Sequence, residues 1–215
     1  AEGAHLEPDQ TYGYAYLNAT RKALTSRKST SAKIGRQVLL VAHDAHPHGA
    51  QNLALHMAKY LSQDFGFQVD MVVLGEGPLL EQYAQFATVH SLAGEDPKGD
   101  KANLLALELA KKGHRSAICN TTVCGLFGGV LKQASFHVVT LIHELPNVIR
   151  DSHLENHVAS IAEHSDKIVF PAAAVAEGFK QFSDIANEKV IIKPQGLYKR
   201  NKFRTDEERQ RARTE

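Results

Sequence analysis

Residues 38–61, VLLVAHDAHPHGAQNLALHMAKYL, carry the clearest structural signal in the chain. The run at 38–43 is apolar at successive positions, which is typical of a strand that is buried on both faces of a sheet. A polar loop follows, and then Leu53, Met57 and Leu61 recur at the spacing of one helical face. This order predicts a buried strand, a short loop and an amphipathic helix, which together make the first half of a strand-helix-strand unit.

Six further β-rich runs alternate with helical stretches along the chain, at 67–74, 87–92, 116–119, 137–143, 166–170 and 189–192. One of the helical stretches repeats leucine, at Leu104, Leu105, Leu107 and Leu109. Strands that alternate with helices form parallel sheets with right-handed crossovers. The sequence therefore predicts a Rossmann-like, doubly wound α/β domain with a mostly parallel sheet of six to seven strands. The strand that begins near Val38 should lie in the interior of that sheet.

The composition of the chain is that of a globular protein, since 43% of its 215 residues are apolar and 23% are charged. Lys and Arg number 25 against 24 Asp and Glu, so the charge excludes a globally basic nucleic-acid binder and we expect no nucleic-acid partner. The two cysteines, Cys119 and Cys124, give no disulfide framework, and no apolar run reaches the ~18–20 residues of a membrane span. These features predict a cytoplasmic protein.

The domain boundaries are predicted from changes in composition. Residues 1–35 should form a helical appendage and a linker, with a helix capped by Asp9 whose apolar face consists of Tyr12, Tyr16, Ala19 and Ala23. Residues 36–198 hold the alternating pattern and form the predicted Rossmann-like domain. Residues 199–215 form a polar, basic tail that we expect to lead to a second domain outside this sequence.

Basic side chains gather in two segments, 21–36 and 199–213. One interpretation is a pair of solvated linkers. The other is a peripheral contact with anionic lipid headgroups at the inner face of a membrane, where each nearby Lys or Arg adds about 1 kcal/mol of binding energy.

The loop after the first strand is the most informative, because ligands bind parallel sheets at the carboxyl ends of the strands. It runs from His43 to Gln51, and the helix is expected to begin at Gly49. A helix N-terminus offers free N–H groups and the positive end of the helix dipole, which favour an anion such as phosphate near His48, Gly49, Ala50 and Gln51. The other interpretation of Gly49 is a tight turn that requires glycine for its geometry.

Three histidines in this loop, His43, His46 and His48, invite a comparison with a metal site. Their spacing matches neither the structural nor the catalytic zinc patterns. A polar loop, or a hydrogen-bonding pocket for a hydroxylated ligand, fits the spacing better. We therefore expect no metal ion.

Two other loops carry candidate side chains. The run at 137–143 leads into His143 and Glu144, which places an imidazole and a carboxylate at the same sheet edge as the first loop. The His143 imidazole either donates to a sugar hydroxyl and exchanges a proton near neutral pH, or bonds to neighbouring backbone without a ligand role. The last strand exits through Gln195 and Gly196, which we interpret as a domain junction.

The residues Asn120-Thr121-Thr122, between Cys119 and Cys124, predict the end of a strand, a cap and the start of a helix. Cys124 should face the core. A nucleophilic role for either thiol would need a positioned base, and the sequence shows none.

Taken together, these loops resemble the N-terminal half of glycosyltransferase family 4, the retaining group-1 transferases with the two-domain GT-B architecture. The matching segments are, in order, the run 38–61, VVLGEGPLLEQY, ICNTTVCG, LIHELPNVI, SDKIVFPAAAVAEGF and KVIIKPQGLY. The last of them is similar to the Pro-Asn-Gly exit into the donor domain, with Gln195 in place of asparagine. The resemblance covers roughly residues 36–198.

The resemblance implies the acceptor-side domain of a retaining glycosyltransferase, which transfers a hexose from a nucleotide-sugar donor to a glycan or another acceptor. It implies no bound cofactor, and it implies that His143 is the catalytic residue that contacts the transferred sugar. Its substrate-binding or phosphate-binding candidates are His48, Gly49, Ala50, Gln51, Glu144, Gln195 and Gly196. Most nucleotide contacts would come from the second domain, so the chain alone is expected to be inactive.

Two alternatives of other classes remain open. The first is a module that binds a nucleotide or a sugar without chemistry, built on the same sheet. The second is a metal-dependent hydrolase that uses His43, His46 and His48. A doubly wound sheet hosts many functions, so the fold alone does not choose among these.

Overall fold

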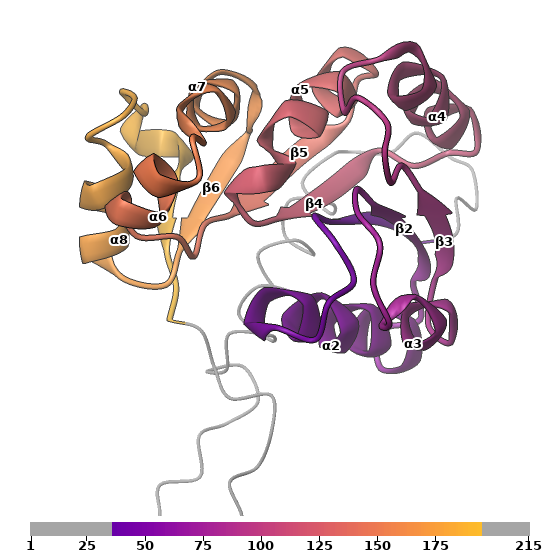
Figure 1. Ribbon diagram of the computed structural model, residues 1–215. Helices are drawn as coiled ribbons and strands as arrows, with labels where there is room; N and C mark the ends of the chain where they lie inside the picture. The colour runs from indigo at the N-terminus through magenta and orange to yellow at the C-terminus, as the bar shows by residue number, and fades with distance from the viewer. Residues whose placement is uncertain (1–35, 195–215) are drawn as a thin grey trace, which may run out of the picture.

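The computed structural model describes residues 36–194, which form one seven-stranded sheet with helices on both faces (Figure 1). The strand order is β3-β2-β1-β4-β5-β6-β7, and every neighbouring pair of strands is parallel. The predicted Rossmann-like α/β fold is therefore confirmed, with the strand of Val38 in the interior. The predicted N-terminal helix and the tail at 199–215 lie outside the described residues.

Each strand ends within two residues of the limits that the sequence predicts. The strands are β1 Gln37–Ala42, β2 Gln68–Val73, β3 Thr88–Ser91, β4 Ser116–Asn120, β5 His137–Leu141, β6 Lys167–Phe170 and β7 Val190–Ile192. The helices are α2 Gly49–Gln63, α3 Leu80–Ala84, α4 Asp100–Lys111, α5 Gly125–Gln133, α6 Pro146–Asp151, α7 Glu155–His164 and α8 Ala173–Phe179, with short 3-10 turns η2 Thr122–Cys124 and η3 Asn187–Lys189.

The two directions in which the chain crosses the sheet decide which face each helix covers. From β1 the chain moves outward through α2 and α3 to the edge strand β3, and it then returns through α4 to β4 on the other side of β1. Because crossovers between parallel strands are right-handed, the outward and return helices must lie on opposite faces. Figure 1 shows α2 and α3 on one face and α4, α5 and α7 on the other.

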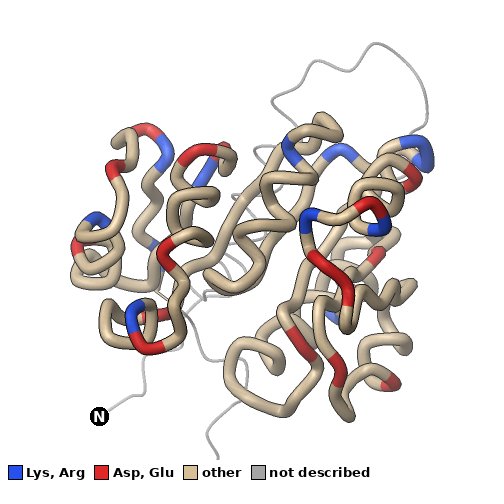
Figure 2. The backbone as a smooth tube through the Cα atoms, turned by 45° about the horizontal axis from the view of Figure 1, so that its top comes forward, with Lys and Arg blue, Asp and Glu red and all other residues tan. Residues whose placement is uncertain are grey.

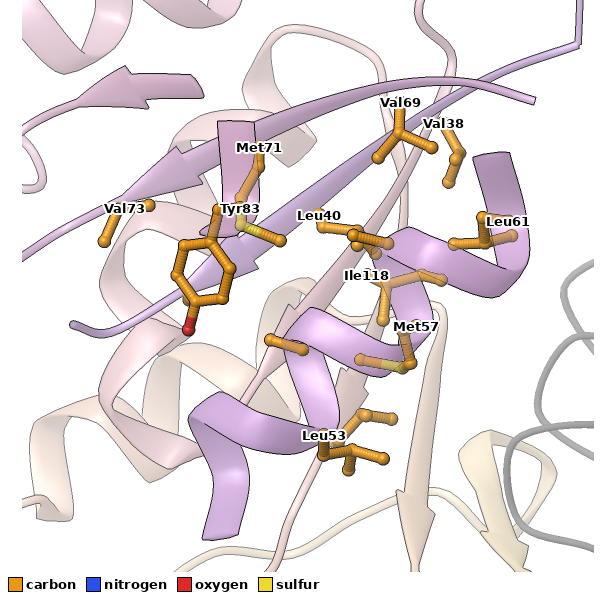
Figure 3. Close-up of a cluster of buried hydrophobic side chains, with 14 of the residues drawn as sticks. Val38, Leu40, Leu53, Met57, Leu61, Val69, Met71, Val73, Tyr83 and Ile118 are labelled. Carbon is orange, nitrogen blue, oxygen red and sulfur yellow. The ribbon is translucent and has the colours of Figure 1, made fainter. Parts of the chain in front are cut away.

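The helix predicted from the segment 38–61 packs against the sheet as expected. Leu53, Met57 and Leu61 of α2 are buried in one apolar cluster with residues of β1 and β2 (Figure 3). Tyr83 of α3 closes this cluster, and its hydroxyl donates to the carbonyl of Gln51 at 3.1 Å. Burial raises the pKa of the Tyr83 phenol, so this hydroxyl stays protonated and remains a donor. The bond ties α3 to the first turn of α2.

Among the four leucines of the repeat in α4, only Leu109 is fully buried. Ala102, Ala106 and Leu109 face the sheet, whereas Leu104 is 61% exposed and Leu107 is 49% exposed. Small alanine side chains let the helix axis approach the sheet closely, and they outweigh the preference of leucine for burial. The hydrophobic period of the segment is helical, but it does not identify the buried side.

A buried carboxylate joins the edge strand β3 to the interior of the sheet. Asp70 of β2 lies 2.6 Å from Nε2 of His90 on β3 and 2.9 Å from Nε2 of His114, which follows α4. Burial by itself would raise the pKa of Asp70, but the contacts with His114 and His90 outweigh it and hold the pKa well below its usual range. The charged carboxylate therefore stabilises the fold.

Replacing Asp70 with Asn should lower the free energy of unfolding by about 2–4 kcal/mol near neutral pH, because the two imidazoles lose a buried charged partner. The folded-state pKa is lowered, so this stabilisation is complete above the unfolded-state value of about 3.9 and is lost as the pH falls through the folded-state value. Urea unfolding at several pH values measures both effects. Substitution of the exposed Asp64 with Asn is the matched control. If the free energy of unfolding of Asp70→Asn followed pH in parallel with that of the wild type, the stabilising role of the Asp70 carboxylate would be contradicted.

Charged side chains are spread over the outer helices and loops, and Figure 2 shows acidic and basic positions interspersed along the tube. None of the helices within 36–194 has the length and apolar character needed to cross a bilayer.

Candidate functional site

The order of the parallel strands reverses between β1 and β4. The helix that follows β1 lies on one face of the sheet, and the helix that follows β4 lies on the other, so the loops after these two strands diverge. Ligands of doubly wound sheets bind in the crevice that such a divergence creates. The candidate site is therefore built from the ends of β1 and β4 and from the neighbouring end of β5.

A single buried amide joins these three strand ends. Asn120, the last residue of β4, is 1% exposed. Its Nδ2 donates to the carbonyl of Ala50 in the first turn of α2 at 2.7 Å, and its Oδ1 lies 3.1 Å from Nε2 of His143. His143 and the start of α2 therefore lie at one edge of the sheet, as predicted, and they are joined by Asn120, which the sequence marked only as the end of a strand.

The loop after β1 forms a second polar network beside this amide. Gln51 Nε2 donates to Oδ1 of Asp44 at 2.5 Å and lies 3.0 Å from Nε2 of His43. Nδ1 of His43 lies 3.3 Å from Oγ1 of Thr121, just beyond β4. Asp44 also accepts the backbone N–H of His46 at 2.9 Å. The loops after β1 and β4 therefore meet where the strand order reverses.

The carboxylate of Glu144 holds the start of the next helical segment. Its Oε2 accepts the hydroxyl of Thr122 at 2.7 Å, the backbone N–H of Thr122 at 3.2 Å and the backbone N–H of His143 at 3.1 Å. A carboxylate at this position satisfies an N–H group that a helix start leaves open, and it interacts favourably with the helix dipole. Glu144 thus organises the loop in which His143 lies.

Thr121 has a backbone conformation that is unusual for a β-branched residue, with φ 95° and ψ 160°. Conformations of this kind cost about 1–3 kcal/mol and persist where the surrounding bonds enforce them. Here the Thr121 N–H donates to the carbonyl of Leu141 at 3.0 Å, which extends the pairing of β4 with β5. The sequence predicted Thr121 as a helix cap, but its side chain makes no cap bond to η2 and contacts His43 instead.

Burial determines the charge state of the central imidazole. Desolvation lowers the pKa of His143, and the nearby negative charge of Glu144 opposes that shift only in part. The ring is therefore neutral at neutral pH.

The two thiols behave as core side chains, because burial raises the pKa of Cys119 to about 12 and raises that of Cys124 well above its usual value.

The glycines around the site have different structural roles. A Cβ on Gly49 would have nothing within 4 Å, so the turn does not require glycine there for space. Gly77, in the Gly-x-Gly loop after β2, has φ +150°, and a Cβ on it would lie 2.2 Å from the backbone of Ala45. Gly77 therefore sets the position of the loop after β1, and Gly49 leaves open space at the start of α2.

All but two of the predicted site residues lie within the described part of the chain. Gly49 begins α2, and His48 precedes it as an exposed residue without a side-chain cap bond. Ala50 and His143 are joined through Asn120, and Gln51 and Glu144 belong to the two polar networks. The remaining two, Gln195 and Gly196, lie outside the described residues.

Asn120, Thr121 and Thr122 bond to three different segments, whereas their sequence pattern predicted only a strand end, a cap and a helix start. The signal for these contacts in the sequence is a run of three polar residues at the end of a strand that is buried on both faces. Within 36–194, no three His, Cys, Asp or Glu side chains are placed to hold a metal ion. His46 and His48 have ring centroids 6.4 Å apart, and His43 bonds toward Gln51 and Thr121.

We expect Gly77→Ala to lower the free energy of unfolding by about 3 kcal/mol, because both the backbone angle and the contact with Ala45 oppose a side chain. Gly49→Ala is the matched control and should leave stability unchanged or raise it by about 0.4–1 kcal/mol. Thermal and urea unfolding compare the two variants. Equal stability of the two would show that the Gly77 contact does not position the loop.

No family model matches the chain, and no curated protein matches it. Among solved structures, HepE of Anabaena in complex with UDP-glucose superposes with a TM-score of 0.58 at 15% identity, covering 75% of this chain and 44% of that one. A sucrose-phosphate synthase structure from Thermosynechococcus elongatus gives a TM-score of 0.51 at 16% identity, covering 75% of this chain and 90% of that one.

The chain thus spans less than half the length of the HepE chain. At these identities the two similarities concern the fold alone. The chain has the Rossmann-like α/β fold of a domain that HepE and this sucrose-phosphate synthase contain.

Proposed function

We propose that the chain is the acceptor-side, N-terminal domain of a retaining GT-B glycosyltransferase of family 4. It takes part in the transfer of a hexose from a nucleotide-sugar donor to a glycan or another hydroxylated acceptor. The observation that carries this proposal is the network between the ends of β1 and β4, where Asn120 joins the start of α2 to His143. Both similar structures support it, because one holds UDP-glucose and the other is a sucrose-phosphate synthase.

The start of α2 supplies the polar surface that this transfer needs. The first-turn N–H groups and the positive end of the helix dipole favour a phosphate or an acceptor oxygen, and the space beside Gly49 admits close approach. Within the described residues, Oε1 of Gln51 is a buried acceptor without a hydrogen-bond partner. A ligand hydroxyl is the chemical group that would satisfy such an atom.

The imidazole of His143 contributes position and polarity to this transfer. Because its pKa is lowered, it borders the transferred sugar as a neutral ring and adds no positive charge. The protein would then act mainly by orienting the donor and the acceptor and by stabilising the departing phosphate. The cations for that phosphate would come from the second domain.

The chain alone should bind UDP-glucose weakly, with a dissociation constant no better than about 1 mM, equivalent to ~4 kcal/mol. The reason is that most nucleotide contacts are assigned to the second domain. Calorimetric titration measures this constant. Micromolar binding would contradict the division between domains and would favour the alternative function, a nucleotide-sugar-binding module without chemistry.

In the full-length protein, His143→Ala should lower turnover about tenfold to a thousandfold, or about 1.4–4 kcal/mol of transition-state stabilisation. Stability should fall by about 1–3 kcal/mol, because the buried Oδ1 of Asn120 loses its donor. His164→Ala is the matched control, because this half-buried histidine bonds to the carbonyl of Ser160 within α7 and takes no part in the site networks. Full turnover in His143→Ala would remove His143 from the catalytic assignment.

A further inference from the structure

The orientation of the Asn120 amide is determined by the atoms around it. The carbonyl of Ala50 can only accept a hydrogen bond, so the group that faces it at 2.7 Å must be Nδ2. Oδ1 then faces the ring of His143. The assignment of nitrogen and oxygen in this side chain follows from the carbonyl and needs no further assumption.

The amide orientation in turn determines the tautomer of the imidazole. Oδ1 of Asn120 can only accept, so Nε2 of His143, at 3.1 Å, must carry the proton of this bond. The neutral ring then has its lone pair on Nδ1, and Nδ1 is the atom that gains a proton when the ring becomes charged. One side-chain amide therefore connects a helix carbonyl to the protonation pattern of the imidazole.

Asn120 is held firmly enough to impose this pattern. Its Cα is paired with Ala42 on one side and with Leu141 on the other, and its side chain is almost completely buried. Its own carbonyl accepts the thiol of Cys124 at 3.3 Å. The Thr121 backbone beyond it is fixed by the bond to Leu141. The amide is therefore anchored by two neighbouring strands and by the turn that follows.

We propose that Asn120 is a positioning residue of the active site, which fixes the Nε2–H tautomer and the ring plane of His143 and couples both to the first turn of α2. The inference rests on the proposed function only in treating His143 as the imidazole that meets the ligand. A ligand that binds at the start of α2 shares the Ala50 peptide with Asn120, so its position and that of the ring are linked through one side chain.

Three variants of this chain separate positioning from simple packing. Asn120→Asp keeps an oxygen acceptor near Nε2, adds a negative charge and removes the donor to Ala50. Asn120→Leu has a similar volume and removes both hydrogen bonds. Asn103→Leu is the matched control, because the Asn103 side chain donates in the same way to the carbonyls of Lys98 and Gly99 at the start of α4.

The readout is nuclear magnetic resonance of ¹⁵N-labelled and ¹³C-labelled histidine, followed through a pH titration. In the wild type we expect the Nε2–H tautomer for His143. Asn120→Asp should keep that tautomer and move the midpoint of the His143 titration upward by about one pH unit or more, because a carboxylate favours the charged ring. Glu144 is present in every variant, so its charge does not account for the difference.

Asn120→Leu should give a mixture of tautomers with no upward movement of the midpoint, and Asn103→Leu should match the wild type. The Nδ1–H tautomer in the wild type, or an unchanged midpoint in Asn120→Asp, would overturn the proposal. Urea unfolding shows whether each variant is folded, and the midpoint is read only on folded protein. If Asn120→Leu does not fold, Asn120→Asp and the wild-type tautomer decide the question.

The titration requires no substrate, so failure of the glycosyltransferase proposal would leave its result unchanged. Conversely, if wild-type His143 proved to be the Nδ1–H tautomer, the expected result of the UDP-glucose titration would not change. In the full-length protein, Asn120→Leu should reduce kcat by about tenfold or more. In Asn120→Asp the pH profile of kcat should shift upward with the His143 midpoint, which a purely structural role would not do.

Discussion

The interior strand β1 has β2 on one side and β4 on the other, and this arrangement determines where the candidate site lies. Helices that leave neighbouring strands toward opposite faces cannot fill the space between their starts. The polar side chains of three strand ends lie along that line and bond to one another across it. The apolar packing on the two faces is what keeps these strand ends in register.

The fold could be predicted from the sequence because buried parallel strands are apolar at successive positions and are separated by helical periods. The orientation of α4 could not, since the contrast between Ala106 inside and Leu107 outside depends on how closely the helix approaches the sheet. The spacing of apolar residues in the sequence gives the period of a helix. The buried side depends on neighbours that are distant in the sequence.

The candidate site was predictable in part for the same reason. Gly49, Gln51 and His143 follow apolar runs, and parallel strands bring such positions to one edge. Asn120 gave only the weak signal of a polar residue at a strand end, because its two partners lie 70 and 23 positions away. Hydrogen bonds between distant segments are set by register and by side-chain length, which neither periodicity nor motif spacing describes.

The contact between Gly77 and Ala45 ties two loops into one structural unit. The N–H of Ala45 donates to Glu76 at 3.0 Å, and the N–H of Leu79 donates back to Ala45 at 2.9 Å, so the loops after β1 and β2 exchange backbone bonds in both directions. Segments joined in this way open together in native-state hydrogen exchange. The loops after β1 and β2 would therefore exchange as one unit, which makes the end of β1 more rigid than a loop without such bonds.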